Sequence, residues 1–117
     1  IEEIDVQIDL DVTSYIPDSF IKNSSQKIEI YQNIALCKDE EDIQNITDEI
    51  IDRYGQIPYE IENLLNITRI KSLARQKFVL KIAQKGDLVS IKVDERIRRN
   101  DKLFKWKDAR LVNDSQD

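Results

Sequence analysis

The side chains that most enzymes use for nucleophilic or metal chemistry are almost missing from this sequence. Its 117 residues include no histidine and one cysteine, Cys37. A Ser-His or Cys-His nucleophile pair therefore cannot be built, and neither can a zinc site of the usual Cys/His type. The two glycines stand far apart, so no glycine-rich phosphate-binding loop is predicted. We expect no catalytic site, no cofactor site and no metal site in this segment by itself.

Cys37 lies in "NIALCKDE", near the end of a predicted helix, and the chain has no histidine that could activate its thiol. We interpret it as a buried or half-buried bystander, because a reactive thiolate needs such an activator. A single cysteine allows no internal disulfide, which is typical of a reducing, cytoplasmic setting. No apolar run approaches the roughly 18 residues of a membrane span, so no membrane contact is expected.

Charged side chains offer one candidate binding surface. Glu49, Asp52 and Arg53 have the i, i+3, i+4 spacing that places them together on one side of a helix. The spacing alone favours an ordinary intrahelical pair between Glu49 and Arg53, which contributes only a few tenths of a kcal/mol. The alternative is a surface for a charged partner.

A second candidate surface is the basic stretch "RIRRNDKLFKWK" at 96–107, where Phe104 and Trp106 alternate with bases. Such a pattern can bind a phosphate backbone and stack on bases. It is more often an amphipathic segment whose aromatic side chains belong to the core. The two halves of the chain also differ in charge, with a net −12 in residues 1–62 and a net +7 in residues 63–117. Each half could therefore meet a partner of opposite charge.

The hydrophobic pattern predicts the elements that position these residues. Apolar side chains two apart in "IEEIDVQIDLDV" predict a strand at 4–12 with one buried face. A first helix follows a Ser24 or Ser25 cap and should bury Ile28, Tyr31, Ile34 and Ala35.

A second helix begins after Asp39, and apolar residues on one face of it define its buried side: Ile43, Ile46, Ile50, Ile51 and Tyr54. Gly55 stands just past that face, where a left-handed residue ends a helix. Pro58 suits the first turn of the next helix, which runs to about residue 77. Gly55 and Pro58 thus predict the tight joint of a helical hairpin.

Strand periodicity returns at 78–93, on both sides of a turn at Lys85, Gly86 and Asp87. The chain is therefore expected to form one α+β domain over residues 1–117. This domain would consist of an N-terminal strand, three helices and a β-hairpin. The hairpin would pair with the first strand to form a sheet. The pattern of residues 94–117 predicts a short helix, a further strand and a frayed tail.

Three stretches in order, "DVTSYIPDSFI", "QKIEIYQNI" and "DEIIDRYGQIPYEIENLL", resemble the C-terminal domain of the bacterial transcription-repair coupling factor. The likeness is collinear over about residues 4–93. The family pattern extends further than this chain does, so the resemblance implies that the domain is truncated or incomplete after about residue 93.

The resemblance implies a non-catalytic regulatory domain of a large ATP-dependent DNA translocase. In that family the domain packs on the UvrB-like N-terminal module of the same chain and covers the surface that the repair protein UvrA needs. RNA polymerase and DNA are reached through other parts of the parent protein. The family's interdomain contact residues correspond to Glu49, Asp52 and Arg53. The alternative is a nucleic-acid-binding accessory domain that uses the basic C-terminal half.

Overall fold

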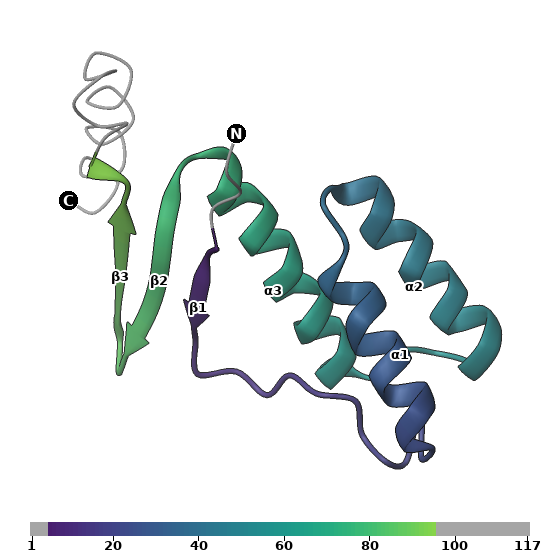
Figure 1. The fold of residues 1–117 in the computed structure, drawn as a ribbon. Coiled ribbons are helices and arrows are strands. Elements are labelled where there is room, and N and C mark those ends of the chain that lie inside the picture. The colour runs from purple at the N-terminus through teal and green to yellow at the C-terminus, as the bar shows by residue number, and fades with distance from the viewer. Residues whose placement is uncertain (1–4, 96–117) are drawn as a thin grey trace.

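The computed structural model describes residues 5–95, which form three helices and one three-stranded sheet (Figure 1). The elements follow in the order β1 (Gln7–Asp9), α1 (Ser24–Ala35), α2 (Glu40–Tyr54), α3 (Tyr59–Gln76), β2 (Val79–Lys85) and β3 (Leu88–Val93). The basic stretch at 96–107 and the elements expected near the C-terminus lie outside the described residues. The single-domain prediction for residues 1–117 also reaches beyond them.

The sheet has β2 in the middle, parallel to β1 and antiparallel to β3. Its register aligns Ile8, Ile82 and Ile91 in one row across the three strands. The α+β class and the pairing of the hairpin with the first strand are confirmed. The first strand is shorter than expected, because only Gln7–Asp9 pair with β2.

A two-residue turn joins β2 to β3, since Lys85 pairs directly with Leu88. Gly86 has a φ of 62° there, whereas Asp87 does not have a positive φ. This combination is that of a type II′ turn, whose first central position favours glycine.

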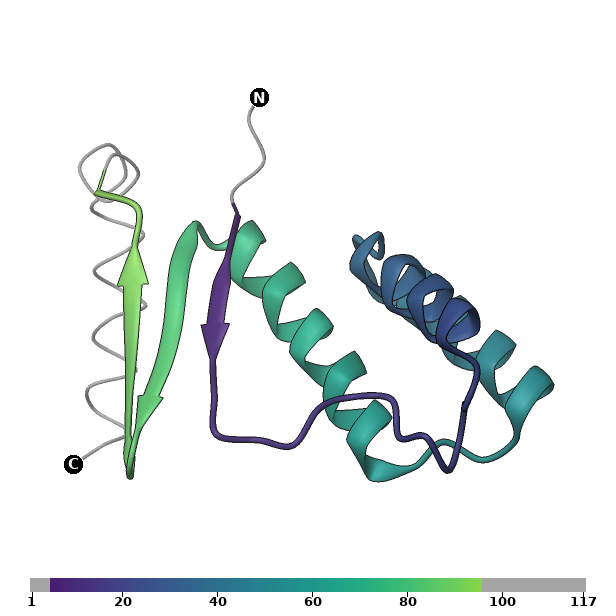
Figure 2. The ribbon, with the colours of Figure 1, turned by 60° about the horizontal axis from the view of Figure 1, so that its bottom comes forward.

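Helix α3 lies between the sheet and the α1–α2 pair, as both views show (Figures 1 and 2). The main core fills the helical half of the molecule. It also takes in Ile16 and Ile21 from the long connection between β1 and α1. Isoleucine dominates this core, and five isoleucines have almost no exposed surface: Ile21, Ile30, Ile43, Ile50 and Ile61.

The predicted buried face of α1 is only partly right. Ile34 is buried as predicted, but the other main buried residue is Ile30, whereas Ile28 is 56% exposed and Tyr31 is 38% exposed. The helix carries apolar residues on two sides, and packing on α2 and α3 selects the side that contains Ile30 and Ile34. The helix also begins differently, because the Asn23 side chain caps it by accepting from the Gln26 N–H, in place of Ser24 or Ser25.

Helix α2 begins at Asp39 as expected, and its N-cap carboxylate accepts a hydrogen bond from the Asp42 N–H. Ile43, Ile46 and Ile50 are buried as predicted. Ile51, by contrast, is 47% exposed, because it lies a quarter-turn beyond the buried stripe.

The joint between α2 and α3 has the expected residues in a different backbone conformation. Gly55 has φ 99° and ψ −162°, a region that glycine alone adopts readily, rather than the left-handed helical region. Its N–H donates to the Ile51 carbonyl at 2.9 Å and so closes the last turn of α2. Pro58 precedes the first helical residue of α3, and its carbonyl accepts from the N–H groups of Ile61 and Glu62.

Candidate functional site

The outer face of α2 presents the three charged residues that the spacing singled out. Ile50 is fully buried, which fixes the rotation of the helix about its axis. Glu49, Asp52 and Arg53 are all exposed as a result. The sequence therefore placed these side chains on the correct side of the helix.

Arg53 bridges two helices. Its Nη1 lies 3.2 Å from Oε1 of Glu29 on α1 and 3.5 Å from Oε2 of Glu49 on its own helix. The shorter contact is thus the interhelical one, and the intrahelical pair expected from the spacing is secondary. Glu29 was missed from sequence because it stands 24 positions before Arg53, and no local spacing rule connects the two.

An aromatic side chain packs against the Arg53 guanidinium. The Arg53 guanidinium carbon lies 5.1 Å from the centroid of the Tyr54 ring, within the range of a cation–π contact. The Tyr54 ring packs in turn on Phe20, with centroids 6.0 Å apart. The hydrogen bond to Glu29, followed by the electrostatic interaction with Tyr54, raises the pKa of Arg53 above its ordinary value. Like any arginine in a protein, Arg53 is a permanent cation.

The remaining acid of the set is free. In the part of the chain that the structure describes, the Asp52 carboxylate makes no hydrogen bond or ion pair. The described surface thus carries three carboxylates, those of Glu29, Glu49 and Asp52, and the cation of Arg53. It carries an excess of negative charge, and one carboxylate remains available to a partner.

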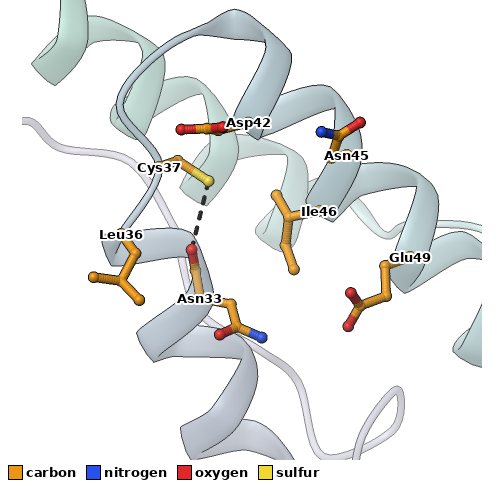
Figure 3. A pocket seen from close by; sticks show the side chains of 7 residues that line it. All are labelled: Asn33, Leu36, Cys37, Asp42, Asn45, Ile46 and Glu49. Atoms are coloured by element: carbon orange, nitrogen blue, oxygen red, sulfur yellow. Dashed lines mark hydrogen bonds between the residues drawn. The ribbon is translucent and has the colours of Figure 1, made fainter.

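A groove of about 430 Å³ runs between α1 and α2 next to this surface (Figure 3). Glu49 belongs to both the groove and the ion network. Side chains from both helices and the short connection between them line the groove: Asn33, Leu36, Cys37, Asp42, Asn45, Ile46 and Glu49.

The groove has no activated nucleophile. Burial, followed by the nearby carboxylates of Asp42 and Asp39, raises the pKa of the Cys37 thiol, so it stays protonated at neutral pH. Its Sγ–H donates to the Asn33 carbonyl at 3.5 Å (Figure 3). The Asp42 carboxylate already accepts the Lys38 N–H at 3.0 Å. Among residues 5–95 no cluster of three metal-binding side chains occurs, and no helix there is both long and apolar enough for a bilayer.

Comparison with known proteins places these residues in a family. The model of the TRCF domain matches residues 10–103, which is most of the chain. The chain belongs to the TRCF domain family. It is 34% identical over 94 residues to the transcription-repair-coupling factor of Bacillus subtilis (strain 168), a stretch that covers 80% of this chain. It is likewise 34% identical over 96 residues to that of Staphylococcus aureus (strain USA300), with 82% of the chain covered.

The TRCF domain described here spans about 8% of the length of these curated relatives. Its fold also matches a crystal structure of the C-terminal domain of a transcription-repair coupling factor, with a TM-score of 0.80 and 28% sequence identity. That match covers 83% of this chain and 60% of the other. The resemblance drawn from the three sequence stretches is confirmed.

Proposed function

We propose that this TRCF domain is a non-catalytic regulatory module of an ATP-dependent DNA translocase that couples transcription to nucleotide excision repair. In this proposal the module packs on the UvrB-like N-terminal module of the same chain and masks the surface that UvrA binds. RNA polymerase and DNA are engaged by other parts of the parent protein, in the cytoplasm. Membership of the TRCF family over residues 10–103 is the observation that carries the proposal.

The outer face of α2 supplies the proposed contact. Asp52 is exposed and free of partners in the described residues, and Arg53 is held beside it by Glu29. Exposed charges of this kind contribute little to the stability of their own domain. They contribute more where a partner excludes water, and removing one member of such a pair costs about 2–5 kcal/mol.

The proposal predicts a split outcome for Asp52→Ala and Arg53→Ala. The isolated chain should unfold within about 0.5 kcal/mol of wild type, because both residues are exposed. The full-length factor should open and capture more UvrA, since a loss of about 1.4 kcal/mol in the closed state shifts its ratio to the open state about tenfold. Thermal melts of the chain and UvrA pull-down with the full-length factor measure the two effects.

Charge-matched variants provide the control. Asp52→Asn and Asp87→Asn each remove one negative charge, but Asp87 lies in the β2–β3 turn, far along the chain from α2. Only Asp52→Asn should increase UvrA capture. Unchanged capture together with a strongly lowered melting temperature for Asp52→Ala and Arg53→Ala would mean that these residues serve only their own fold.

The sheet favours a second candidate function, nucleic-acid binding by the basic half of the chain. Lys81 and Lys92 are directly paired across β2 and β3, and both are exposed. Like charges in directly opposite positions repel each other, and a phosphate backbone would relieve that repulsion. A salt titration of duplex DNA binding tests this candidate: micromolar or tighter binding that weakens steeply with salt would support it, and Lys81→Ala should reduce the affinity.

A further inference from the structure

We propose that Glu29 on α1 is a positioning residue of the interdomain surface, and that it holds the Arg53 guanidinium in the orientation that meets the partner module. The inference rests on the proposed function, because it concerns how the same surface is built. It also extends that surface from one helix to two.

The contact geometry separates two sides of the guanidinium. Both described acceptors, Glu29 at 3.2 Å and Glu49 at 3.5 Å, are reached through Nη1 of Arg53. Within residues 5–95, Nε and Nη2 make no hydrogen bond. A guanidinium has five N–H donors in a rigid plane, so fixing it through Nη1 leaves the donors of Nε and Nη2 for a partner. One edge of Arg53 is thus engaged with its own domain, and the other is open to a partner.

Glu29 makes the stronger of the two contacts that fix this orientation. Without it, Arg53 would keep only the 3.5 Å contact to Glu49 and the stacking on Tyr54. An arginine side chain has many rotamers, and ordering it on binding reduces affinity. Because Glu29 orders Arg53 before the partner arrives, losing Glu29 should weaken the closed state even if Glu29 never touches the partner.

A second ion pair in the same domain provides a matched control. Arg69 on α3 donates through Nε to Glu40 on α2 at 2.8 Å. This pair also joins two helices, and its side chains are exposed to a similar extent. It lies at the opposite end of α2, so Glu40→Ala breaks an interhelical Arg–Glu pair and leaves Arg53 untouched.

The experiment is UvrA pull-down with four variants of the full-length factor: Glu29→Ala, Arg53→Ala, the double variant and Glu40→Ala. Glu29→Ala should raise UvrA capture roughly two- to fivefold, the range expected for one exposed pair, and Glu40→Ala should not change it. The double variant should capture no more than Arg53→Ala alone, because Glu29 acts through Arg53.

A charge swap separates positioning from simple helix bridging. The double change Glu29→Arg with Arg53→Glu restores an ion pair between α1 and α2 but places a carboxylate where the partner meets a guanidinium. A positioning role predicts UvrA capture as high as that of Arg53→Ala, even though an ion pair again joins the two helices. Capture restored to the wild-type level would show that the bridge matters only for holding α1 on α2, and would overturn the inference.

Failure of the inference can be told apart from failure of the proposed function. If Arg53→Ala leaves UvrA capture unchanged, the surface itself is wrong and the inference fails with it. If Arg53→Ala raises capture but Glu29→Ala does not, only the role of Glu29 is wrong. Lower capture in Glu29→Ala would mean that Glu29 competes with the partner for Arg53, and this too would overturn the inference.

Discussion

At the scale of single residues, Asp52 and Arg53 are neighbours in sequence but have different surroundings. Arg53 reaches Glu29 on another helix and stacks on Tyr54. Asp52 has no partner in the described part of the chain. Both side chains are exposed because of their positions in the helical repeat of α2. Only Arg53 is paired with another helix, because α1 packs where Glu29 can reach it. A binding role for Asp52 is therefore easier to test than one for Arg53, because its substitution breaks no internal contact.

Gly55→Ala should lower the free energy of unfolding by about 1–3 kcal/mol, because φ 99° with ψ −162° suits glycine alone. A Cβ at this position would meet nothing within 4 Å, so the whole cost is one of backbone conformation. Chemical denaturation of the 117-residue chain measures the loss.

The neighbouring exposed residue serves as the control for Gly55. Gln56→Ala should change the free energy of unfolding by no more than about 0.5 kcal/mol, since its side chain is exposed and makes no described hydrogen bond. An equally small change for Gly55→Ala would disprove the account of the α2–α3 joint.

At the scale of elements, α1 shows how a helix with two apolar sides is oriented. Ile28 and Ile30 are chemically identical, lie two positions apart and differ in exposure by more than half of their surface. The hydrophobic pattern of the helix could not choose between them. Contact with α2 and α3 makes the choice.

Substituting these two isoleucines tests the orientation of α1. Ile30→Ala should cost about 2–5 kcal/mol, because Ile30 is fully buried and its truncation leaves a cavity. Ile28→Ala should change stability by only about 0.5 kcal/mol, since its side chain is largely exposed. Urea denaturation measures both variants, and equal losses would mean that α1 is rotated from the orientation described here.

The Glu40–Arg69 bridge between α2 and α3 predicts a pH dependence. The hydrogen bond from Arg69, with the charge of Arg69 adding to it, lowers the pKa of Glu40 below its ordinary 4.5. A carboxyl whose pKa is lower in the folded state stabilises that state above its unfolded pKa, and it loses this contribution as the pH falls through the folded pKa.

Melting temperatures of wild type and Glu40→Gln should therefore differ at neutral pH, with wild type the higher. The difference should shrink below about pH 4.5 and vanish once Glu40 is protonated in wild type. High salt should reduce the difference at neutral pH, because both side chains are accessible to solvent. A difference that persists at low pH would show that the ion pair is not its source.

At the scale of the whole molecule, the parallel pairing of β1 with β2 brings the first described residues next to a strand near the end of the described chain. Gln7 pairs with Lys81 across the three intervening helices. Val6, just before β1, is buried at 4% exposure, although it lies outside the main helical core. The sheet and the helices are thus expected to unfold together.

Val6→Ala should lower the free energy of unfolding by about 1–2 kcal/mol, the value for two methylene equivalents plus a small cavity. Val12→Ala is the control, because Val12 is 46% exposed and should be nearly neutral. Circular dichroism should show one shifted transition for the whole domain. Two separate transitions in the Val6 variant would show that the sheet folds independently of the helices.

The sequence by itself determined the features that depend on near neighbours along the chain. The N-cap at Asp39, the joint at Gly55 and Pro58, the hairpin turn at Gly86 and the outward side of α2 all follow from short-range sterics, hydrogen bonding and periodicity. The order of these elements was also sufficient to indicate the family.

Only the tertiary structure decided what depends on residues far apart in sequence. The choice of the Ile30 side of α1 and the bridge from Glu29 to Arg53 both require helices to pack at a particular rotation. The shortening of the first strand to Gln7–Asp9 likewise required its pairing with β2, more than 70 positions along the chain. Local sequence patterns indicate which faces of a helix or strand can be buried. Packing of the elements against one another decides which of these faces is buried, because the core has room for only one set of side chains.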